Sequence, residues 1–320
     1  GIQSLANENH SNADKATKLG RFVECPMLTA KQTLFWSSEL PISANSCHRI
    51  LRGIVSRQIE EDCELDFAAD TSHWQRRAGE CPDGTTRRLA AFEILAPRSQ
   101  SRVLDIGCGG GQLMRDLALA VAPGGRAVGI DVSDDQLEAA RTLCADAPCA
   151  EFFNADVCEL AWEDGFFDAA SSIQTLEYVA DVDRALKEVR RVLRLGGRVA
   201  FISVLWDAYQ FHGAEPELNG RVIDGFRAHC PHQMLPLEMP KRMSNAGLAG
   251  VSQRPLTIYN SSFHENTYAY CASRFVAAFV VTQGIVEDEV RDWLDQLARA
   301  DQDGRFGFVS VPVLTMGTAT

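Results

Sequence analysis

Apolar and polar positions follow two patterns in turn between residues 102 and 204. Short apolar runs, such as Val103, Leu104 and Ile106, predict buried strands, whereas apolar residues three or four positions apart predict helices. The predicted strands are 102–106, 127–130, 151–155, 166–171 and 198–203. Helices are predicted between most of these strands, and this alternation predicts a parallel sheet joined by right-handed crossovers.

The ends of the predicted helices carry capping signals. Ser133 and Gln136 form a capping box at the start of the helix that follows the second strand, and Leu143 is expected on its buried face. The helix after the fourth strand is expected to begin near Asp181 and to end at Gly196–Gly197.

The flanking segments have a different character. Apolar spacing predicts a helix at 45–60 and another that Thr85–Thr86 cap and that ends before Pro97. Strands are predicted at Val251–Tyr259 and Phe306–Met316, with helices between them and one or two helices in 205–248. The predicted division is a poorly ordered arm (1–30), an N-terminal helical segment (31–98), the core (99–204), an insertion (205–248) and a C-terminal part of the core sheet with helices (249–320).

Composition narrows the class of protein. The chain has 43 acidic and 31 basic residues and a net charge of −12, which argues against a nucleic-acid partner. We expect no membrane span and no signal peptide, because no apolar segment reaches about 20 residues and the first residues are charged. Ten cysteines without a CxxC pair predict reduced thiols, a cytoplasmic location and no metal site.

A glycine turn follows the first predicted strand and indicates a ligand site. The pattern is Asp105-x-Gly107-x-Gly109-x-Gly111, and such glycines let a ligand lie against bare backbone. The dinucleotide fingerprint requires glycine at position 112, where this chain has Gln112. An acidic residue at the strand end suits a ligand with an ammonium and a sulfonium group rather than a pyrophosphate. A purely structural turn is the alternative.

Three successive predicted strands end in or near an aspartate. These are Asp105, Asp131 and Asp156. A single aspartate at such a place is commonly a turn former or a helix cap. In an open α/β sheet, however, ligands bind beyond the carboxyl ends of the strands. Three aspartates beside one glycine turn therefore favour a shared binding site.

The glycine turn resembles motif I of the class I S-adenosylmethionine (SAM)-dependent methyltransferases. The stretch from Gly165 to Tyr178, with the helix from Asp181 to Gly196–Gly197, resembles motifs IV and V of the ubiquinone/menaquinone-biosynthesis-like group, which mostly modifies small molecules. The resemblance covers about residues 100–205. It implies an α/β, Rossmann-like, seven-stranded, mostly parallel sheet with a closing antiparallel hairpin, plus an N-terminal helical lid.

The resemblance also implies SAM as the cofactor and S-adenosylhomocysteine as its product. Asp131 would accept the ribose hydroxyls, Asp156 the adenine amino group, and Asp105 would favour the methionine ammonium. The backbone near Ile173 and Gln174 would face the methionine end. The cofactor-binding candidates are Asp105, Gly107, Gly109, Gly111, Gln112, Asp131, Val132, Asp156, Val157, Ile173 and Gln174.

The expected reaction is an in-line displacement at the sulfonium methyl group. An acidic phenol or thiol needs no base, whereas an alcohol or a carbon acceptor needs one. The catalytic candidates are Tyr178, His212 and Asp207, with His229 and His232 as further possible bases. Tyr178 stands where many relatives carry histidine, which puts that role in doubt. Each candidate also has a structural interpretation, as a packed aromatic or a surface-loop residue.

The expected partner is a small-molecule acceptor. Aromatic residues in 1–85 and 205–248 favour a flat or apolar one. The atom that receives the methyl group (O, N, C or S) is left open by the sequence. Two other functions remain as alternatives: a SAM-binding protein without turnover, and an NAD-dependent dehydrogenase, against which Gln112 argues.

Overall fold

The strands predicted between residues 102 and 204 are present in the computed structural model, which describes residues 71–320. These residues belong to one unit of the chain, 65–320. The predicted arm at 1–30 and the predicted helix at 45–60 lie outside the described residues.

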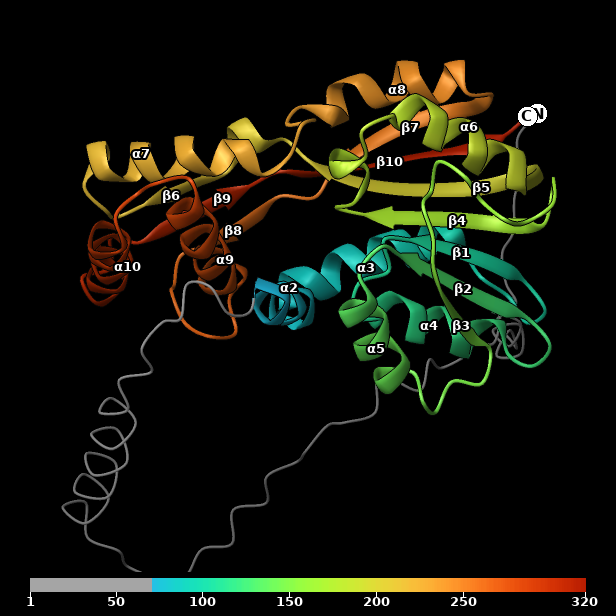
Figure 1. The fold of residues 1–320 in the computed structure, drawn as a ribbon, viewed down its shortest axis with the longest axis horizontal. Coiled ribbons are helices and arrows are strands. Elements are labelled where there is room, and N and C mark those ends of the chain that lie inside the picture. Colours follow the sequence, from blue (N-terminus) through green and yellow to red (C-terminus); the bar gives the residue numbers. More distant parts are fainter. Residues whose placement is uncertain (1–70) are drawn as a thin grey trace, which may run out of the picture. The chain divides into compact units, whose positions relative to one another are not determined.

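A seven-stranded sheet forms the larger part of the fold (Figure 1). Its order is β3-β2-β1-β4-β5-β10-β7. The strands are β1 (Arg102–Ile106), β2 (Arg126–Asp131), β3 (Ala150–Asn154), β4 (Phe167–Ile173), β5 (Leu193–Val204), β7 (Leu248–Pro255) and β10 (Pro312–Ala319). The first five are parallel, and β10 is antiparallel to both of its neighbours. This confirms the predicted fold class.

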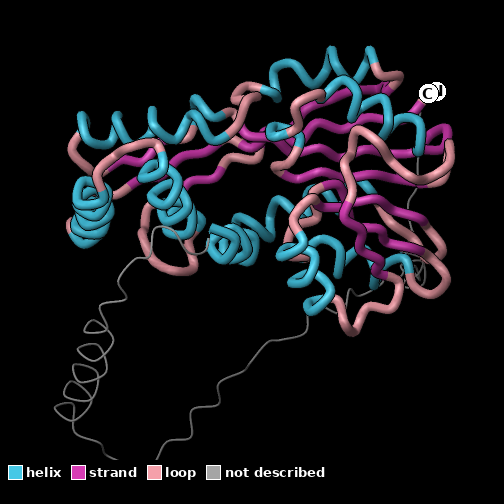
Figure 2. Tube along the Cα trace, in the orientation of Figure 1, coloured by secondary structure: helices cyan, strands magenta, loops and turns pink. Residues whose placement is uncertain are grey.

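Helices cover both faces of this sheet, which is why its central strands are buried over most of their length and mainly apolar. On one face lie α3 (Pro82–Leu95), α4 (Gln112–Val121) and α5 (Asp134–Leu143), and on the other α6 (Val182–Val192) and α8 (Leu235–Asn245). Figure 2 shows the strands running between these two helical layers.

A smaller second region is built around a three-stranded sheet. Its strands, in the order β6-β9-β8, are β6 (Gln210–His212), β8 (Ile258–Asn260) and β9 (Gly307–Ser310). Helices α7 (Pro216–Phe226), α9 (Tyr268–Thr282) and α10 (Glu287–Gln302) pack around it, and α2 (Thr71–Glu80) lies against α9. The core here is rich in aromatic residues, among them the fully buried Trp293, Tyr209 and Phe211.

The two predicted C-terminal strands each prove to be two strands in different sheets. The prediction Val251–Tyr259 spans β7 and β8, and the prediction Phe306–Met316 spans β9 and β10. The closing strands β7 and β10 are antiparallel, as expected, but residues 256–311 intervene instead of a hairpin turn. Alternation of apolar residues shows that a segment is extended, not which sheet it joins.

Some predicted helix boundaries are also wrong. Helix α3 begins at Pro82 rather than at Thr85–Thr86, because proline fits the first helical position and the Thr86 hydroxyl donates back to the Pro82 carbonyl at 2.9 Å. Helix α6 is capped by Asp181 but ends at Val192, before Gly196–Gly197, because Leu193 already pairs with β4.

Only half of the capping box predicted for α5 forms, and the buried face of the helix is shorter than predicted. The Ser133 hydroxyl accepts a hydrogen bond from the Gln136 backbone N–H at 3.4 Å. The Gln136 side chain reaches to Gln75 on α2 instead of back to the cap. Leu143 is 41% exposed, so the buried face of this helix ends at Ala140.

The glycine turn after β1 is held against β2. The backbone N–H groups of Gly107 and Cys108 both donate to the Ile130 carbonyl, at 2.8 and 3.0 Å. Gly107, Gly109 and Gly111 have φ values of 65°, 51° and 85°, a region that side chains with a Cβ rarely adopt. The turn therefore needs glycine for its backbone shape.

Alanine substitutions at Gly107 and Gly109 separate two reasons for glycine in this turn, which are the backbone conformation and the lack of space for a side chain. A Cβ at Gly107 would lie 2.0 Å from Thr175 Oγ1, whereas a Cβ at Gly109 would meet no atom within 4 Å. Gly109→Ala should cost about 1–2 kcal/mol of unfolding free energy, for the backbone alone. Gly107→Ala should cost about 1–3 kcal/mol more, because a clash is added. Urea unfolding measures the free energy of both variants, provided that their m-values are equal. An equal loss of unfolding free energy in the two variants would refute the clash with Thr175 as a cause.

Candidate functional site

A cavity of about 1010 Å³ opens at the carboxyl ends of the strands. Its walls come from the glycine turn, the ends of β2, β3 and β4, helices α2 and α3, and the aromatic residues of the second region. This volume is at the upper end of the range for small-molecule sites, so it has room for two ligands side by side.

The cavity brings together all of the cofactor-binding candidates except Gly111. Those that line it are Asp105, Gly107, Gly109, Gln112, Asp131, Val132, Asp156, Val157, Ile173 and Gln174. Gly111 instead precedes α4, and a Cβ there would lie 2.9 Å from Ala140. Its role is the close packing of α4 against α5.

Asp105 is the most deeply buried acid of the cavity wall, at 3% exposed. Its carboxylate accepts a hydrogen bond from the Ser171 hydroxyl at 2.8 Å. Burial raises the pKa of Asp105 to about 7, with a smaller contribution from the charge of Asp131, and the hydrogen bond from Ser171 opposes the rise. The group is therefore divided between its charged and neutral forms near neutral pH.

The other two strand-end acids are tied to neighbouring backbone. One oxygen of Asp131 accepts from the Gly109 N–H at 2.9 Å, and the other from the Ser133 N–H at 3.0 Å. Asp156 accepts from the Cys158 N–H at 2.8 Å. The expected turn-forming role is thus real. Because an ionised carboxylate has about four acceptor sites, each acid can still receive a ligand.

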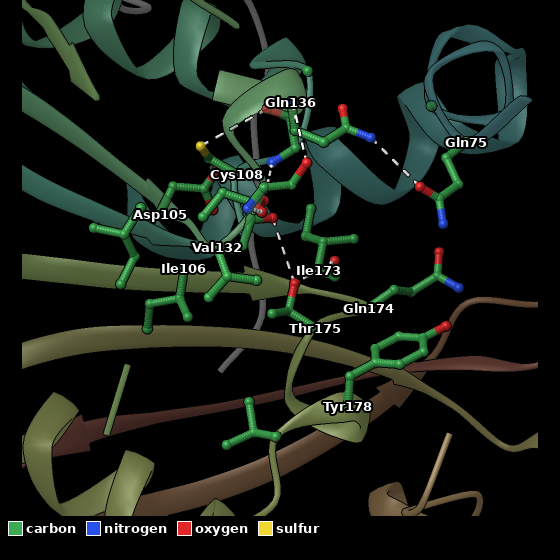
Figure 3. A pocket seen from close by; sticks show the side chains of 18 of the residues that line it. Gln75, Asp105, Ile106, Cys108, Val132, Gln136, Ile173, Gln174, Thr175 and Tyr178 are labelled. Carbon is green, nitrogen blue, oxygen red and sulfur yellow. Dashed lines mark hydrogen bonds between the residues drawn. The ribbon is translucent and has the colours of Figure 1, made fainter. Parts of the chain in front are cut away.

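The segment after β4 has an unusual backbone. Gln174 has a φ of 53° although it is not glycine, and its N–H donates to the Ile202 carbonyl at 2.7 Å. Such residues cluster where a backbone serves a ligand. Figure 3 shows the Gln174 side chain extending alongside Tyr178, away from Asp105. Its amide oxygen accepts a hydrogen bond from Arg87.

Of the three catalytic candidates, the cavity contains one. Tyr178 lines it, and the residue as a whole is 47% exposed. The surrounding protein raises the pKa of its hydroxyl well above the ordinary value, which keeps it protonated. Asp207 and His212 do not line the cavity: Asp207 pairs with Arg227, and His212 is an exposed residue of β6. After β5 the chain turns into the smaller sheet and carries both away.

His229 lines the cavity instead, and it was only a secondary candidate. Its Nδ1 lies 2.7 Å from the Phe226 carbonyl, so Nδ1 must carry the hydrogen. Its Nε2 is buried and has no partner among the described residues. Burial lowers the pKa of His229 to about 4, which keeps the ring neutral. His232 is no base candidate here, because its Nε2 lies 3.0 Å from the Val179 carbonyl.

The cavity continues into what we call the aromatic end. It is formed by Tyr178, Trp206, Phe226, His229, Tyr268, Phe275 and Phe279. His229 stacks on Phe226 with ring centroids 4.0 Å apart and meets the edge of Trp206 at 4.2 Å. The residues come from η2 (Leu176–Tyr178), η3 (Trp206–Ala208), α7, η4 (Arg227–His229) and α9. No local motif marks such a set, which is why the sequence did not reveal it.

Helices α2 and α3 form another wall of the same cavity. Gln75, Arg76, Arg87 and Arg88 line it, and Figure 3 shows Gln75 facing Gln136 across it. These helices belong to the segment 31–98, for which a lid was predicted. Their position is suited to that role, and a closing motion stays a prediction.

No group of three or more histidine, cysteine or acidic side chains within residues 71–320 is arranged to hold a metal ion. Within the same residues, no helix combines the length and apolar character that crossing a bilayer requires.

Known proteins similar to this chain agree with the geometry. A methyltransferase-domain family matches residues 104–201. The demethylmenaquinone methyltransferase of Roseiflexus castenholzii is 31% identical over 196 residues, covering 55% of this chain and 80% of that protein. The 27-O-demethylrifamycin SV methyltransferase of Amycolatopsis mediterranei is 34% identical over 134 residues, covering 40% of this chain and 48% of that protein.

The fold also has a structural counterpart. The YcgJ protein of Bacillus subtilis superimposes with a TM-score of 0.51 at 19% identity, over 73% of this chain and 98% of that one. Several other curated relatives are matched over only 34% to 56% of their own length. The methyltransferase-domain match, over residues 104–201, includes the glycine turn and the strand-end acids. The chain therefore belongs to the class I SAM-dependent methyltransferases, in the group related to the ubiquinone and menaquinone biosynthesis enzymes.

Proposed function

We propose that this protein transfers the methyl group of SAM to a small, flat and largely apolar acceptor. The observation that carries the proposal is the continuity of one cavity. Its first part has the glycine turn and the three strand-end acids, and its second part is the aromatic end. A cofactor in the first part would present its reactive methyl group to a molecule in the second.

The cofactor pose follows from the positions of the acids. Asp131 would accept the ribose hydroxyls and Asp156 the adenine amino group, with adenine between Val132 and Val157. Val132 is 75% exposed, which suits a residue that a flat ring covers on binding. The methionine part would cross the glycine turn toward the backbone of Ile173 and Gln174, where Asp105 meets its ammonium.

The chemical step needs alignment more than acid–base catalysis. A nucleophilic atom of the acceptor forms a bond to the methyl carbon while the carbon–sulfur bond breaks, and sulfur leaves as a neutral thioether. The protein's contribution is to hold these three atoms in line and to exclude water. For a hydroxyl acceptor, His229 Nε2 would accept the hydroxyl hydrogen bond and so aim an oxygen lone pair at the methyl group. As the carbon–oxygen bond forms, the hydroxyl proton would pass to Nε2, and the weakly basic ring would release it to bulk solvent when the product leaves.

Tyr178 is better suited to contact than to proton removal, because its own proton is held tightly. Binding of SAM without turnover is the second candidate function, and the glycine turn alone would serve it equally well. The aromatic end favours turnover, since a protein that only binds SAM needs no second compartment. Family membership argues against the dehydrogenase alternative.

The deciding experiment measures binding and turnover separately. Calorimetry of the full chain should show binding of SAM and S-adenosylhomocysteine but not of NAD. A screen of phenols, quinols and aromatic acids with labelled SAM should then give a methylated product. Cofactor binding without any methylated product in the screen would favour the non-catalytic function.

Asp131→Ala should weaken SAM binding by about 1.5–3 kcal/mol, because the charge-assisted bonds to the ribose are lost. Titration calorimetry measures the change. Asp134→Ala is the matched control, since Asp134 starts α5 and bonds to Asn154 outside the cavity. Unchanged affinity in the Asp131 variant, with the fold intact, would remove Asp131 from the site.

SAM affinity should fall as the pH is lowered from about 8 to 6. The cofactor ammonium favours ionised Asp105, whose pKa is about 7 in the empty protein, so below that pH a proton must first be displaced. The loss should approach tenfold per pH unit below the pKa. Asp105→Asn should give a flat profile over this range. A slope that persists in the variant would assign the effect to another group.

His229→Leu should lower kcat with a hydroxyl acceptor by about 10- to 100-fold, while the Kd for SAM stays unchanged. The reason is the loss of the single neutral acceptor atom that we place beside the reacting hydroxyl. Steady-state kinetics with the best acceptor from the screen provides the measurement, and His212→Leu, at an exposed position of β6, is the control. Equal activity of the two variants would exclude His229.

A further inference from the structure

Arg87 on α3 is a buried cation that lines the cavity and lacks an acidic partner. It is 4% exposed, and no carboxylate of residues 71–320 forms an ion pair with it. Glu177, a fully buried residue of η2, is influenced by the charge of Arg87 but forms no ion pair with it and does not line the cavity. An unpaired buried charge is costly for a fold to keep, which points to a partner that arrives from outside the protein.

The surroundings of Arg87 leave part of its guanidinium available. One amino group donates to the Gln174 side-chain oxygen, and the guanidinium lies 4.6 Å from the centroid of the Tyr268 ring. Its Nε is buried with no hydrogen-bond partner among the described residues. The planar group is thus held in place by uncharged hydrogen-bond and ring partners, and the Glu177 carboxyl influences it only from beyond ion-pair distance.

Other arginines along the cavity are placed differently. Arg88 pairs with Asp116 at 3.9 Å and also bonds to the Gly79 carbonyl. Arg184 is exposed and pairs with Glu159 at 3.8 Å. Arg76 packs over the glycine turn, with its side chain 3.0 Å from where a Cβ of Gly110 would be. Arg87 alone among these four contacts the aromatic end, through Tyr268.

We propose that Arg87 binds an anionic oxygen group of the methyl acceptor, a carboxylate or an ionised phenol or enol, on a planar aromatic body. This rests on the proposed function, and it adds the charge of the substrate class. The body would lie among Trp206, Phe226 and Phe279, with its anionic edge on Arg87 and Gln174. A guanidinium is a planar fork of donors that matches such oxygens.

The test uses a pair of probes that share one ring and differ in charge. The full chain is saturated with S-adenosylhomocysteine and titrated with 2-naphthoate and, separately, with the neutral 2-naphthamide. We expect the naphthoate to bind about 10- to 100-fold more tightly. No preference for the anion, or no binding of either probe, would overturn the proposal without touching the assignment of the cofactor site.

Variants then locate the preference. Arg87→Met should abolish it, Arg87→Lys should keep part of it, and Arg184→Met should leave it unchanged as the control for general positive charge.

The cofactor's own carboxylate is the other anion that Arg87 could bind. If Arg87→Met lowers S-adenosylhomocysteine affinity and leaves the probe ratio unchanged, Arg87 serves the cofactor and the proposal is wrong. Should Arg87→Met fail to fold, the wild-type probe ratio still decides.

Discussion

The site depends on the hydrogen bonds that tie the glycine turn after β1 to the end of β2. Asp131, at the end of β2, accepts the N–H of Gly109, while the Ile130 carbonyl accepts two N–H groups from the same turn. These bonds bend the chain after β1 back over the edge of the sheet. The glycine turn, the strand-end acids and the start of α4 then surround one space. Without these hydrogen bonds, the same residues would stand on separate loops.

The cavity wall contains buried charged and polar groups that do not stabilise the fold. Asp105 is buried deeply enough to lose much of its charge near neutral pH, and a leucine there would be easier to fold around. Arg87 on α3 and His229 in the aromatic end add buried polar atoms without hydrogen-bond partners among the described residues. In most proteins such atoms are satisfied internally. Their concentration around one cavity is physically consistent with groups that a ligand completes.

How much the sequence could predict follows from how local each feature is. The first five strands and the acids at their ends were predictable because each pattern lies within one short stretch. The aromatic end was not, since Trp206, His229 and Tyr268 come from segments that meet only in the folded chain. His212 illustrates the difference: it follows β5 closely, yet the strand direction of β6 carries it out of the cavity.

The cofactor half and the aromatic half of the cavity consequently differ in how a substitution affects the sheet. The cofactor half is made of backbone turns and short acids fixed by the sheet, so a change there alters the sheet edge itself. The aromatic half is made of side chains from η2, η3, α7, η4 and α9, most of which pack in the core of the second region rather than against the seven-stranded sheet. A fold divided in this way can hold one cofactor while its acceptor varies. The shape and charge of the aromatic half therefore select the acceptor. Arg87 restricts the choice of acceptor more than the apolar side chains do, because a buried cation requires an anionic group.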